Sequence, residues 1–267
     1  MEILHSRTTE PGLVMTALSE RLTLVARTCA KHGDYEAAVY RGHEAPCPEC
    51  FRQQSEADAA ALAAQRAAEW RQRRADQLLG RAAIPPRFAD RRLDSFVPHA
   101  EGPKRALAIA KEFAEQFADG SKTGRSLIFC GGVGAGKTHL AVGICHEVIR
   151  QDRAAVFTSV LGAVRSIKDT YRRDSKENEA DAIARLVEPD LLVLDEVGVQ
   201  FGSETEKMYL FEIINGRYEA LKPTIVISNL AKDALTEYLG ERVVDRLREG
   251  GGRMVIFDWP SYRRSAA

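Results

Sequence analysis

One glycine-rich stretch, GGVGAGKT at residues 131–138, constrains the fold of this 267-residue chain more than any other feature. It directly follows the apolar run SLIFC (126–130) and leads into KTHLAVGICHEVI, a segment with helical patterning. Glycines let the backbone curl so that several amide groups point at one anion, and the helix that follows turns the positive end of its dipole toward the same point. The order of strand, glycine-rich turn and helix therefore predicts a phosphate-binding loop (P-loop) in an α/β domain.

The residue types in this loop predict binding of ATP with Mg²⁺. Lys137 would neutralise the β- and γ-phosphates, and Thr138 would hold Mg²⁺ through its hydroxyl group. A glycine-rich turn that carries Lys-Thr by coincidence is the alternative, and the flanking strand and helix argue against it. We expect nucleotide contacts along the whole loop, from Gly131, Gly132, Val133, Gly134, Ala135, Gly136, Lys137, Thr138 and His139.

Four more short apolar runs follow the loop and alternate with helical patterns. Continuous apolar runs of this length, often β-branched, are typical of strands buried on both faces of a parallel sheet. With SLIFC they predict a five-stranded, mostly parallel sheet. The four runs are AAVFTS (154–159), DLLVLD (190–195), PTIVIS (223–228) and RMVIFD (253–258).

Polar side chains stand at the ends of two of these runs. Asp195 would orient the hydrated Mg²⁺, because ligands of such sheets bind beyond the carboxyl ends of the strands. Glu196 is placed to activate the attacking water as a general base, so the acidic pair favours hydrolysis over nucleotide storage. Asn229 either contacts the γ-phosphate or the attacking water, or caps a helix that starts near Lys232.

Three of the five cysteines lie close together near the start of the chain, in CAKHGDYEAAVYRGHEAPCPEC (29–50). Cys29 and His32 form a C-x2-H pair, and Cys47 and Cys50 form a C-x2-C pair separated from the first by the length of a hairpin. Three thiolates and one imidazole would bind Zn²⁺ as a closed, structural site. His43 is a rival fourth ligand. A redox role is the weaker reading because no thioredoxin-like unit surrounds the pair, and scattered thiols are the remaining alternative.

The rest of the N-terminal part has helical character. Residues 52–79 contain no glycine or proline and predict a long helix. Prolines and glycines then mark a linker, so we expect an N-terminal zinc-binding and partner-docking domain (1–80), a linker (81–102) and an ATPase domain (103–267). Residues 13–28 predict a short helix from apolar side chains at helical spacing: Leu13, Leu18, Leu22, Val25 and Ala26.

Composition excludes several classes of protein. Lysine and arginine together number 38, as do aspartate and glutamate, so the formal net charge is zero and any contact with nucleic acid must come from a local patch. No apolar run approaches the roughly 20 residues needed to span a bilayer. The N-terminus also lacks a signal-peptide pattern. We therefore expect a cytoplasmic protein with no membrane partner.

Four ordered stretches resemble the AAA+ helicase loaders of bacteria and their phages (DnaC-type). They are GGVGAGKTHLAVGI, DLLVLDEVGVQ, LGERVVDRLREGG and VIFDWPSYRR, and the resemblance covers roughly residues 80–264, including IPPRFADRRLDSF as the family's linker. The resemblance implies an AAA+ P-loop NTPase. The chain ends three residues after Arg264, so we expect no separate helical lid.

The resemblance also assigns roles to C-terminal arginines. The pattern R-x3-R-x3-G places Arg246 at the position of an arginine finger that reaches the ATP of a neighbouring protomer, with Arg242 beside it. On spacing alone, a solvated face of ion pairs is the favoured reading of this helix. The terminal SYRR matches a proposed second phosphate sensor, which would be Arg263.

The segment LGAVRSIKDTYRRDSKENEADAIARLVEP (161–189) is longer than a single helix. Initiator-type AAA+ proteins, which this part resembles, carry an extra DNA-facing helix at this place. Its basic and aromatic side chains could meet a single-stranded backbone and stack a base, whereas an ordinary exposed amphipathic helix is an equal alternative. The side chains are Lys168, Tyr171, Arg172 and Arg173.

The function that the resemblance implies is ATP-dependent helicase loading. A homo-oligomer would bind a replicative hexameric DNA helicase, open it and deliver it to single-stranded DNA, with ATP hydrolysis driving release. Some loaders have a zinc-binding N-terminal domain and others have none, so the resemblance alone does not imply the metal. Two alternatives stay open: an IstB-type transposition helper, against which the cysteine stretch and the IPPRF linker weigh, and an ATP-switched DNA-binding regulator with little turnover.

Overall fold

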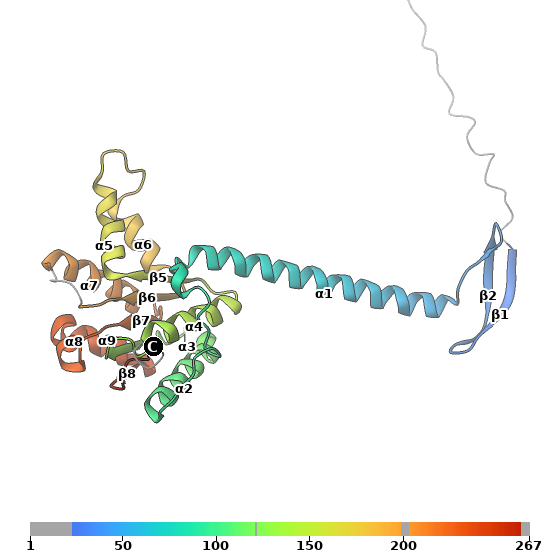
Figure 1. Cartoon of the computed structure of the whole chain (residues 1–267). Coiled ribbons are helices and arrows are strands. Elements are labelled where there is room, and N and C mark those ends of the chain that lie inside the picture. The colour runs from blue at the N-terminus through green and yellow to red at the C-terminus, as the bar shows by residue number, and fades with distance from the viewer. Residues whose placement is uncertain (1–22, 121, 199–202, 263–267) are drawn as a thin grey trace, which may run out of the picture. The chain divides into compact units, whose positions relative to one another are not determined.

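The computed structural model describes residues 23–120, 122–198 and 203–262. The chain divides into two compact units, residues 1–69 and 70–267 (Figure 1). Each unit has its own sheet. No helix in the described ranges is long and apolar enough to cross a membrane.

The first unit contains a small antiparallel sheet of three strands, followed by the start of a long helix. The strands are β1 (Thr23–Cys29), β2 (Gly33–Tyr40) and β3 (His43–Glu44), in the order β1-β2-β3. Helix α1 (Pro48–Arg81) is 34 residues long and extends the predicted helix at both ends. Its first 22 residues belong to this unit and the remainder to the second.

The helix predicted over residues 13–28 is wrong for residues 23–28, which form most of β1. This strand pairs antiparallel with β2 along its whole length, ending with Cys29 opposite Gly33. β-Branched residues favour an extended backbone once a partner strand is present, and this pairing outweighs the helical spacing of the apolar residues. Leu13, Leu18 and Leu22 lie outside the described residues.

The second unit is built on the predicted five-stranded sheet, and all its strand pairs are parallel. The order is β5-β6-β7-β4-β8, which places the strand before the glycine-rich loop between two neighbours. The strands are β4 (Leu127–Gly131), β5 (Ala155–Ser159), β6 (Leu191–Asp195), β7 (Thr224–Ile227) and β8 (Arg253–Phe257).

Helices cover both faces of this sheet and give it two separate cores. Along β6, Leu191 and Val193 pack in the core with α2 and α4, whereas Leu192 and Leu194 pack in the core with α5, α6, α7 and α9. This alternation explains why each strand is a continuous apolar run. The helices are α2 (Glu101–Glu115), α3 (Phe117–Gly120), α4 (Lys137–Arg150), α5 (Val160–Lys168), α6 (Glu179–Val187), α7 (Glu204–Glu219), α8 (Lys232–Leu239) and α9 (Glu241–Arg248).

The predicted linker packs against α4 rather than crossing open solvent. Leu93 is buried in the core of the second unit, the predicted ATPase part (the ATPase unit below), and lies so close to Gly143 that a Cβ there would come within 2.7 Å of the leucine Cδ2. Two histidines of α4 hold the linker backbone: His139 Nε2 lies 2.9 Å from the Arg92 carbonyl oxygen, and His146 Nε2 lies 2.9 Å from that of Ala89. The linker is therefore part of the folded ATPase unit.

A buried arginine connects three elements at the amino ends of strands β6 and β7. Arg217 on α7 is fully buried, and burial lowers the pKa of its guanidinium to about 9, so it stays charged at neutral pH. Its hydrogen bonds join the end of α6 to the beginnings of β6 and β7. The acceptors are Thr224 Oγ1 (2.9 Å) and the carbonyl oxygens of Leu186 (3.0 Å), Val187 (2.8 Å), Pro189 (2.9 Å) and Pro223 (2.5 Å).

We predict that Arg217→Met lowers the free energy of unfolding of the ATPase unit by about 3–5 kcal/mol, because several buried acceptors lose their donors together. Chemical denaturation measures the change. Arg185→Met is the matched control, since Arg185 makes an exposed ion pair with Glu177 (2.7 Å) and its loss costs less than about 1 kcal/mol. Equal effects of the two substitutions would contradict the role assigned to Arg217.

Candidate nucleotide-binding site and metal cluster

The glycine-rich loop connects β4 to α4, as predicted, and its backbone conformation depends on glycine at two positions. Gly131 has a φ of +117°, and a Cβ there would lie 2.5 Å from the carbonyl oxygen of Phe257. Gly136 has a φ of +97° and is the N-cap of α4, with no side chain capping the helix. No side chain of the described residues therefore caps the positive end of this helix dipole, where an anion can bind.

Lys137 lies inside the loop rather than in solvent. Its side chain is 5% exposed, and its ammonium group donates to the carbonyl oxygens of Gly131 (2.8 Å) and Gly132 (2.6 Å). The ammonium group also lies 5.9 Å from the centre of the Phe257 ring. A positive charge is thus held where the loop would surround phosphate oxygens.

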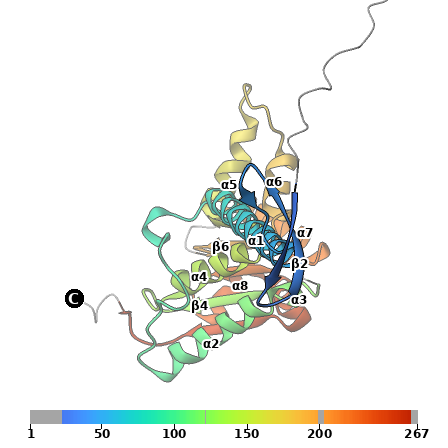
Figure 2. The same cartoon turned by 90° about the vertical axis from the view of Figure 1, so that its right-hand side faces the viewer.

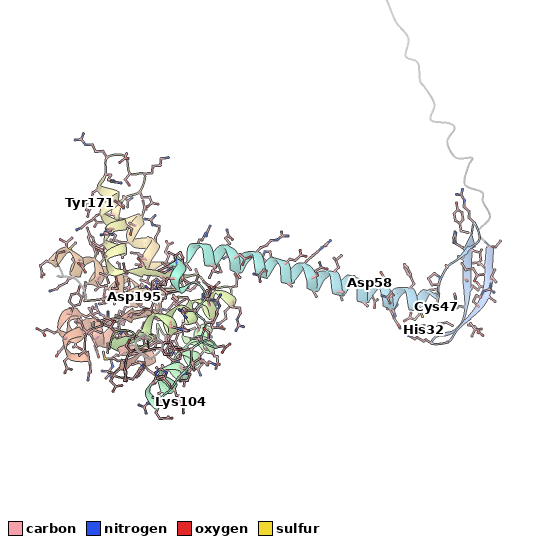
Figure 3. The ribbon with its side chains drawn as sticks, viewed as in Figure 1. His32, Cys47, Asp58, Lys104, Tyr171 and Asp195 are labelled. Atoms are coloured by element: carbon pink, nitrogen blue, oxygen red, sulfur yellow. The ribbon has the colours of Figure 1, made fainter. Side chains whose placement is uncertain are left out.

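Thr138 and Asp195 come together from α4 and the end of β6. The Thr138 hydroxyl donates to Asp195 Oδ2 at 3.1 Å, and the backbone amide of Glu196 donates to Asp195 Oδ1 at 2.7 Å. Burial raises the pKa of Asp195, so an adjacent cation would stabilise its charged form. A hydroxyl and a carboxylate oxygen are ligands that suit Mg²⁺. Figure 3 shows Asp195 inside the ATPase unit.

Glu196 is exposed and has a φ of +62°, an uncommon backbone conformation for a residue other than glycine. It lines the same cavity as Thr138 and Asn229, at the carboxyl ends of the strands. The alternative in which Asn229 caps α8 is wrong, because the N-cap of that helix is Ala231, which makes no side-chain capping bond. The structure therefore brings all three polar side chains to the glycine-rich loop.

This cavity has a volume of about 360 Å³, and much of its wall was not predicted. Linker residues and the segment after β8 line it together with the loop. These residues lie far from the glycine-rich loop in the sequence. The only signal that could have indicated them is the presence of aromatic side chains in a proline-rich segment. The residues that sequence reasoning missed are Phe88, Arg91, Ser95, Phe96, Val97, His99, Ile227, Trp259 and Tyr262.

His139 faces the linker rather than standing free in the cavity. Its Nε2 lies 2.9 Å from the Arg92 carbonyl oxygen and 3.2 Å from Ser95 Oγ, and its ring meets that of Phe96 edge-on at 5.2 Å. Burial lowers the pKa of His139. It lines the predicted site, but its ring nitrogen is engaged with protein groups.

Arg242 and Arg246, the two arginines of α9 to which the resemblance assigns roles, do not line this cavity. Arg246 donates to Asn215 Oδ1 on α7, and its guanidinium lies over the rings of Tyr218 (5.3 Å) and Phe211 (5.7 Å). Among the described residues no ion pair joins Arg246 to an acidic neighbour, so the predicted ion-pair face is not formed. Arg242 is exposed. Arg263 lies outside the described residues.

The insert forms α5, a short turn at Asp169–Tyr171 and α6, which pack side by side and project from the ATPase unit (Figures 1 and 2). Tyr171, labelled in Figure 3, is 60% exposed. Its hydroxyl is hydrogen-bonded to Glu179 on α6 and to the hydroxyl of Tyr209 on α7, so the ring is anchored at one end. The other three residues of the predicted cluster are basic and exposed: Lys168, Arg172 and Arg173.

A Cys3His cluster forms in the first unit, where the turn after β1 meets the first turn of α1. The ligand atoms of Cys29, His32, Cys47 and Cys50 lie within 4.8 Å of one another. His32 Nδ1 lies 3.3 Å from Cys50 Sγ, and Figure 3 shows His32 and Cys47 at this place. His43 lies on β3, outside the cluster, so His32 is the histidine that the fold brings to the cysteines.

The thiol pKa values indicate what the cluster needs. Backbone amides, first that of Lys31, lower the pKa of Cys29 to about 6, whereas the hydrogen bond with Cys29 raises the pKa of Cys50 to about 11. One thiolate therefore opposes ionisation of the next. A bound cation removes this conflict, and soft thiolate ligands with one imidazole suit Zn²⁺.

The sheet and the glycine-rich loop together define the ATPase unit as a P-loop NTPase. The IstB-like ATP binding protein family matches residues 51–248, and this chain belongs to that family of AAA+ ATPases. The predicted resemblance to helicase loaders is also confirmed. The chain is 37% identical to the replicative helicase loader DnaC of Escherichia coli K12 over 183 residues, which are 68% of this chain and 73% of that protein.

Solved structures show the same ATPase fold. A crystal structure of the DnaC helicase loader superposes with a TM-score of 0.57 at 24% identity, covering 64% of this chain and 99% of the other. AMPPCP-bound DnaA from Aquifex aeolicus superposes with a TM-score of 0.54 at 25% identity, covering 65% of this chain and 51% of the other.

We predict that Gly136→Ala weakens ATP binding by about tenfold or more, since alanine is strained at this φ and its methyl group would lie 2.6 Å from the Phe96 ring. Titration with a fluorescent ATP analogue measures the effect. Gly80→Ala in α1 is the control, because nothing lies within 4 Å of its added methyl group. Unchanged ATP affinity in the Gly136 variant would show that this loop conformation is not needed for binding.

Proposed function

We propose that this protein loads a replicative hexameric DNA helicase onto single-stranded DNA and that ATP hydrolysis drives its release. The observation that carries the proposal is a cavity that joins the glycine-rich loop to Asp195, Glu196 and Asn229, in a chain that is 37% identical over 183 residues to a protein named replicative helicase loader. The alignment with this protein covers many more residues than the loop and the sheet contain. Its function is therefore a better guide than the P-loop alone, which serves many reactions.

In the proposed ATPase reaction, the amides of the loop and Lys137 bind the phosphates. Thr138 and Asp195 would hold Mg²⁺, which would supply positive charge to the phosphates. Glu196 would accept a proton from the attacking water while the water oxygen bonds to the γ-phosphorus. The bond between the γ-phosphorus and the oxygen that bridges it to the β-phosphate breaks, which gives ADP and phosphate. Asn229 lies in the same cavity and would orient the water or the γ-phosphate.

Arg246 would act on the ATP of a neighbouring protomer. It lies on α9 and does not line its own cavity, which supports action in trans within a homo-oligomer formed on the helicase. Its contacts with Asn215 and Tyr218 would hold the guanidinium at the surface of the ATPase unit. Arg242, one turn earlier and exposed, would contact the same nucleotide, and Arg263 is proposed as the second sensor.

Single-stranded DNA would bind at the projecting insert. Three basic side chains are exposed there: Lys168, Arg172 and Arg173. Tyr171 adds an exposed ring whose hydroxyl group is hydrogen-bonded to Glu179 and Tyr209. A local cluster of this kind can contact a phosphate backbone although the net charge of the chain is zero.

The N-terminal part (1–80) would hold Zn²⁺ and dock the helicase, with residues 81–102 linking it to the ATPase domain (103–267). The four ligands leave no open coordination position, so the metal would be structural rather than catalytic. Cytoplasmic action is part of this proposal.

We predict that the immobilised protein retains purified replicative helicase but not transposase, and that a zinc chelator abolishes this retention while ATP binding is unchanged. His32→Ala should lose both the zinc, measured by atomic absorption, and the helicase. His43→Ala should keep both, because His43 lies outside the cluster.

Retention of transposase in place of helicase would favour the transposition helper that the family's IstB-like name suggests. Loss of both ATP and helicase binding on chelation would contradict the division of labour between the two parts. A steady-state rate of ATP hydrolysis that helicase and single-stranded DNA leave near zero would favour the ATP-switched regulator.

We predict that Arg246→Ala retains ATP binding but loses the hydrolysis that helicase or DNA stimulates, by about 10³-fold or more as for other trans arginines. Mixing this variant with Lys137→Ala should restore part of the rate, because a finger from one protomer then meets an intact site on the other. Full activity of Arg246→Ala as a purified monomer would refute the trans role.

A further inference from the structure

The segment that follows β8 donates two hydrogen bonds to carbonyl groups of the P-loop. Trp259 Nε1 donates to the carbonyl oxygen of Ala135 at 3.0 Å, and the backbone amide of Tyr262 donates to the carbonyl oxygen of Gly134 at 3.1 Å. Both residues also line the nucleotide cavity. Two consecutive carbonyl groups of the P-loop therefore point at residues 259–262.

Peptide geometry links these carbonyl groups to the amides that would bind phosphate. In a trans peptide the C=O of one residue and the N–H of the next point in opposite directions in one plane. Because the carbonyls of Gly134 and Ala135 are fixed toward residues 259–262, the amides of Ala135 and Gly136 point the opposite way. Within the described parts of the chain, neither amide has a protein acceptor.

The Trp259 ring is itself held in position. It packs on the Phe257 ring with centroids 4.7 Å apart. Gly102, in the first turn of α2, leaves room for it, since a Cβ at this position would lie 2.7 Å from Trp259 Cε3. The donor is thus attached to β8 on one side and bounded by α2 on the other.

We propose that Trp259 and Tyr262 are positioning residues for nucleotide binding. They fix two carbonyl groups of the P-loop so that the amides of Ala135 and Gly136 already face the phosphates before the nucleotide arrives. Preorganised donors bind an anion without the cost of ordering the loop. The proposal rests on nucleotide binding at this loop and does not require helicase loading.

The main test is Trp259→Phe, which keeps an aromatic ring for packing and removes the donor. We expect the Kd of ADP and of ATP to rise by about three- to tenfold, the equivalent of one hydrogen bond. The Kd of AMP, measured by competition, should rise less because AMP lacks the β-phosphate that the loop amides bind. At saturating ATP the kcat should stay within about twofold, so the effect appears in KM.

Trp70→Phe is the matched control, because Trp70 is the other tryptophan of the chain and is 59% exposed. It should leave all three affinities unchanged. Equal weakening of AMP, ADP and ATP by Trp259→Phe would show that the ring serves the nucleoside end of the cavity. Unchanged affinities would show that the hydrogen bond does not position the loop. Either result would overturn the proposal.

A second pair of variants isolates the Tyr262 amide. Tyr262→Ala and Tyr262→Pro both lose the ring, and only the proline lacks the N–H. ADP should therefore bind about three- to tenfold more weakly to the proline variant. This comparison decides the question even if Trp259→Phe folds poorly, because residue 262 follows the last strand. Equal ADP affinities of the two variants would count against a role for the amide.

Gly102→Ala tests the same contact from α2, outside the cavity lining. Its methyl group should displace the Trp259 ring and weaken ADP binding, whereas in the Trp259→Phe background it should have little further effect. Additive effects would show that Gly102 acts by another route and that the ring position is unimportant. A protein that binds ADP normally but no helicase would overturn the proposed function and not the positioning role.

Discussion

The nucleotide site depends on one constraint: the P-loop must leave backbone amides unpaired while the carbonyl groups of Gly131, Gly132, Gly134 and Ala135 find donors. Buried backbone groups rarely remain without hydrogen bonds, so a loop of this kind needs donors from elsewhere. Lys137 supplies two of them to the start of the loop, and the segment after β8 supplies two more. The bare amides are then stable enough to await an anion.

Segments from both ends of the ATPase unit also pack around the loop. Phe96 from the linker occupies the space beside Gly136, and His99 lies 5.5 Å from Tyr262, ring centre to ring centre. The two α4 histidines hold the linker backbone against the helix that begins at the loop. A change in the loop on nucleotide binding would therefore act on the linker backbone that these histidines hold.

The features that could be predicted from the sequence are those that depend on residues close together in the chain. The five strands and the loop are recognisable because burial on both faces and the need for glycine leave local patterns. The cavity wall from Phe88 to His99 and at Trp259 was missed, because it forms by contacts between residues far apart in the chain. Strand β1 was mistaken for helix, since its apolar spacing fits both structures and only pairing with β2 decides between them.

The Cys3His cluster acquires its importance from how little else holds the first unit together. Between residues 23 and 69 the structure buries only two hydrophobic side chains, Ala37 and Cys47, and one of these is itself a cluster ligand. Domains of this size seldom fold on apolar burial alone and commonly use a metal or disulfides instead. The hydrogen bond with Cys29 raises the pKa of Cys50, so without a cation the two thiols resist ionising together. With a metal bound, the four residues of the cluster would provide the cross-link that replaces a core.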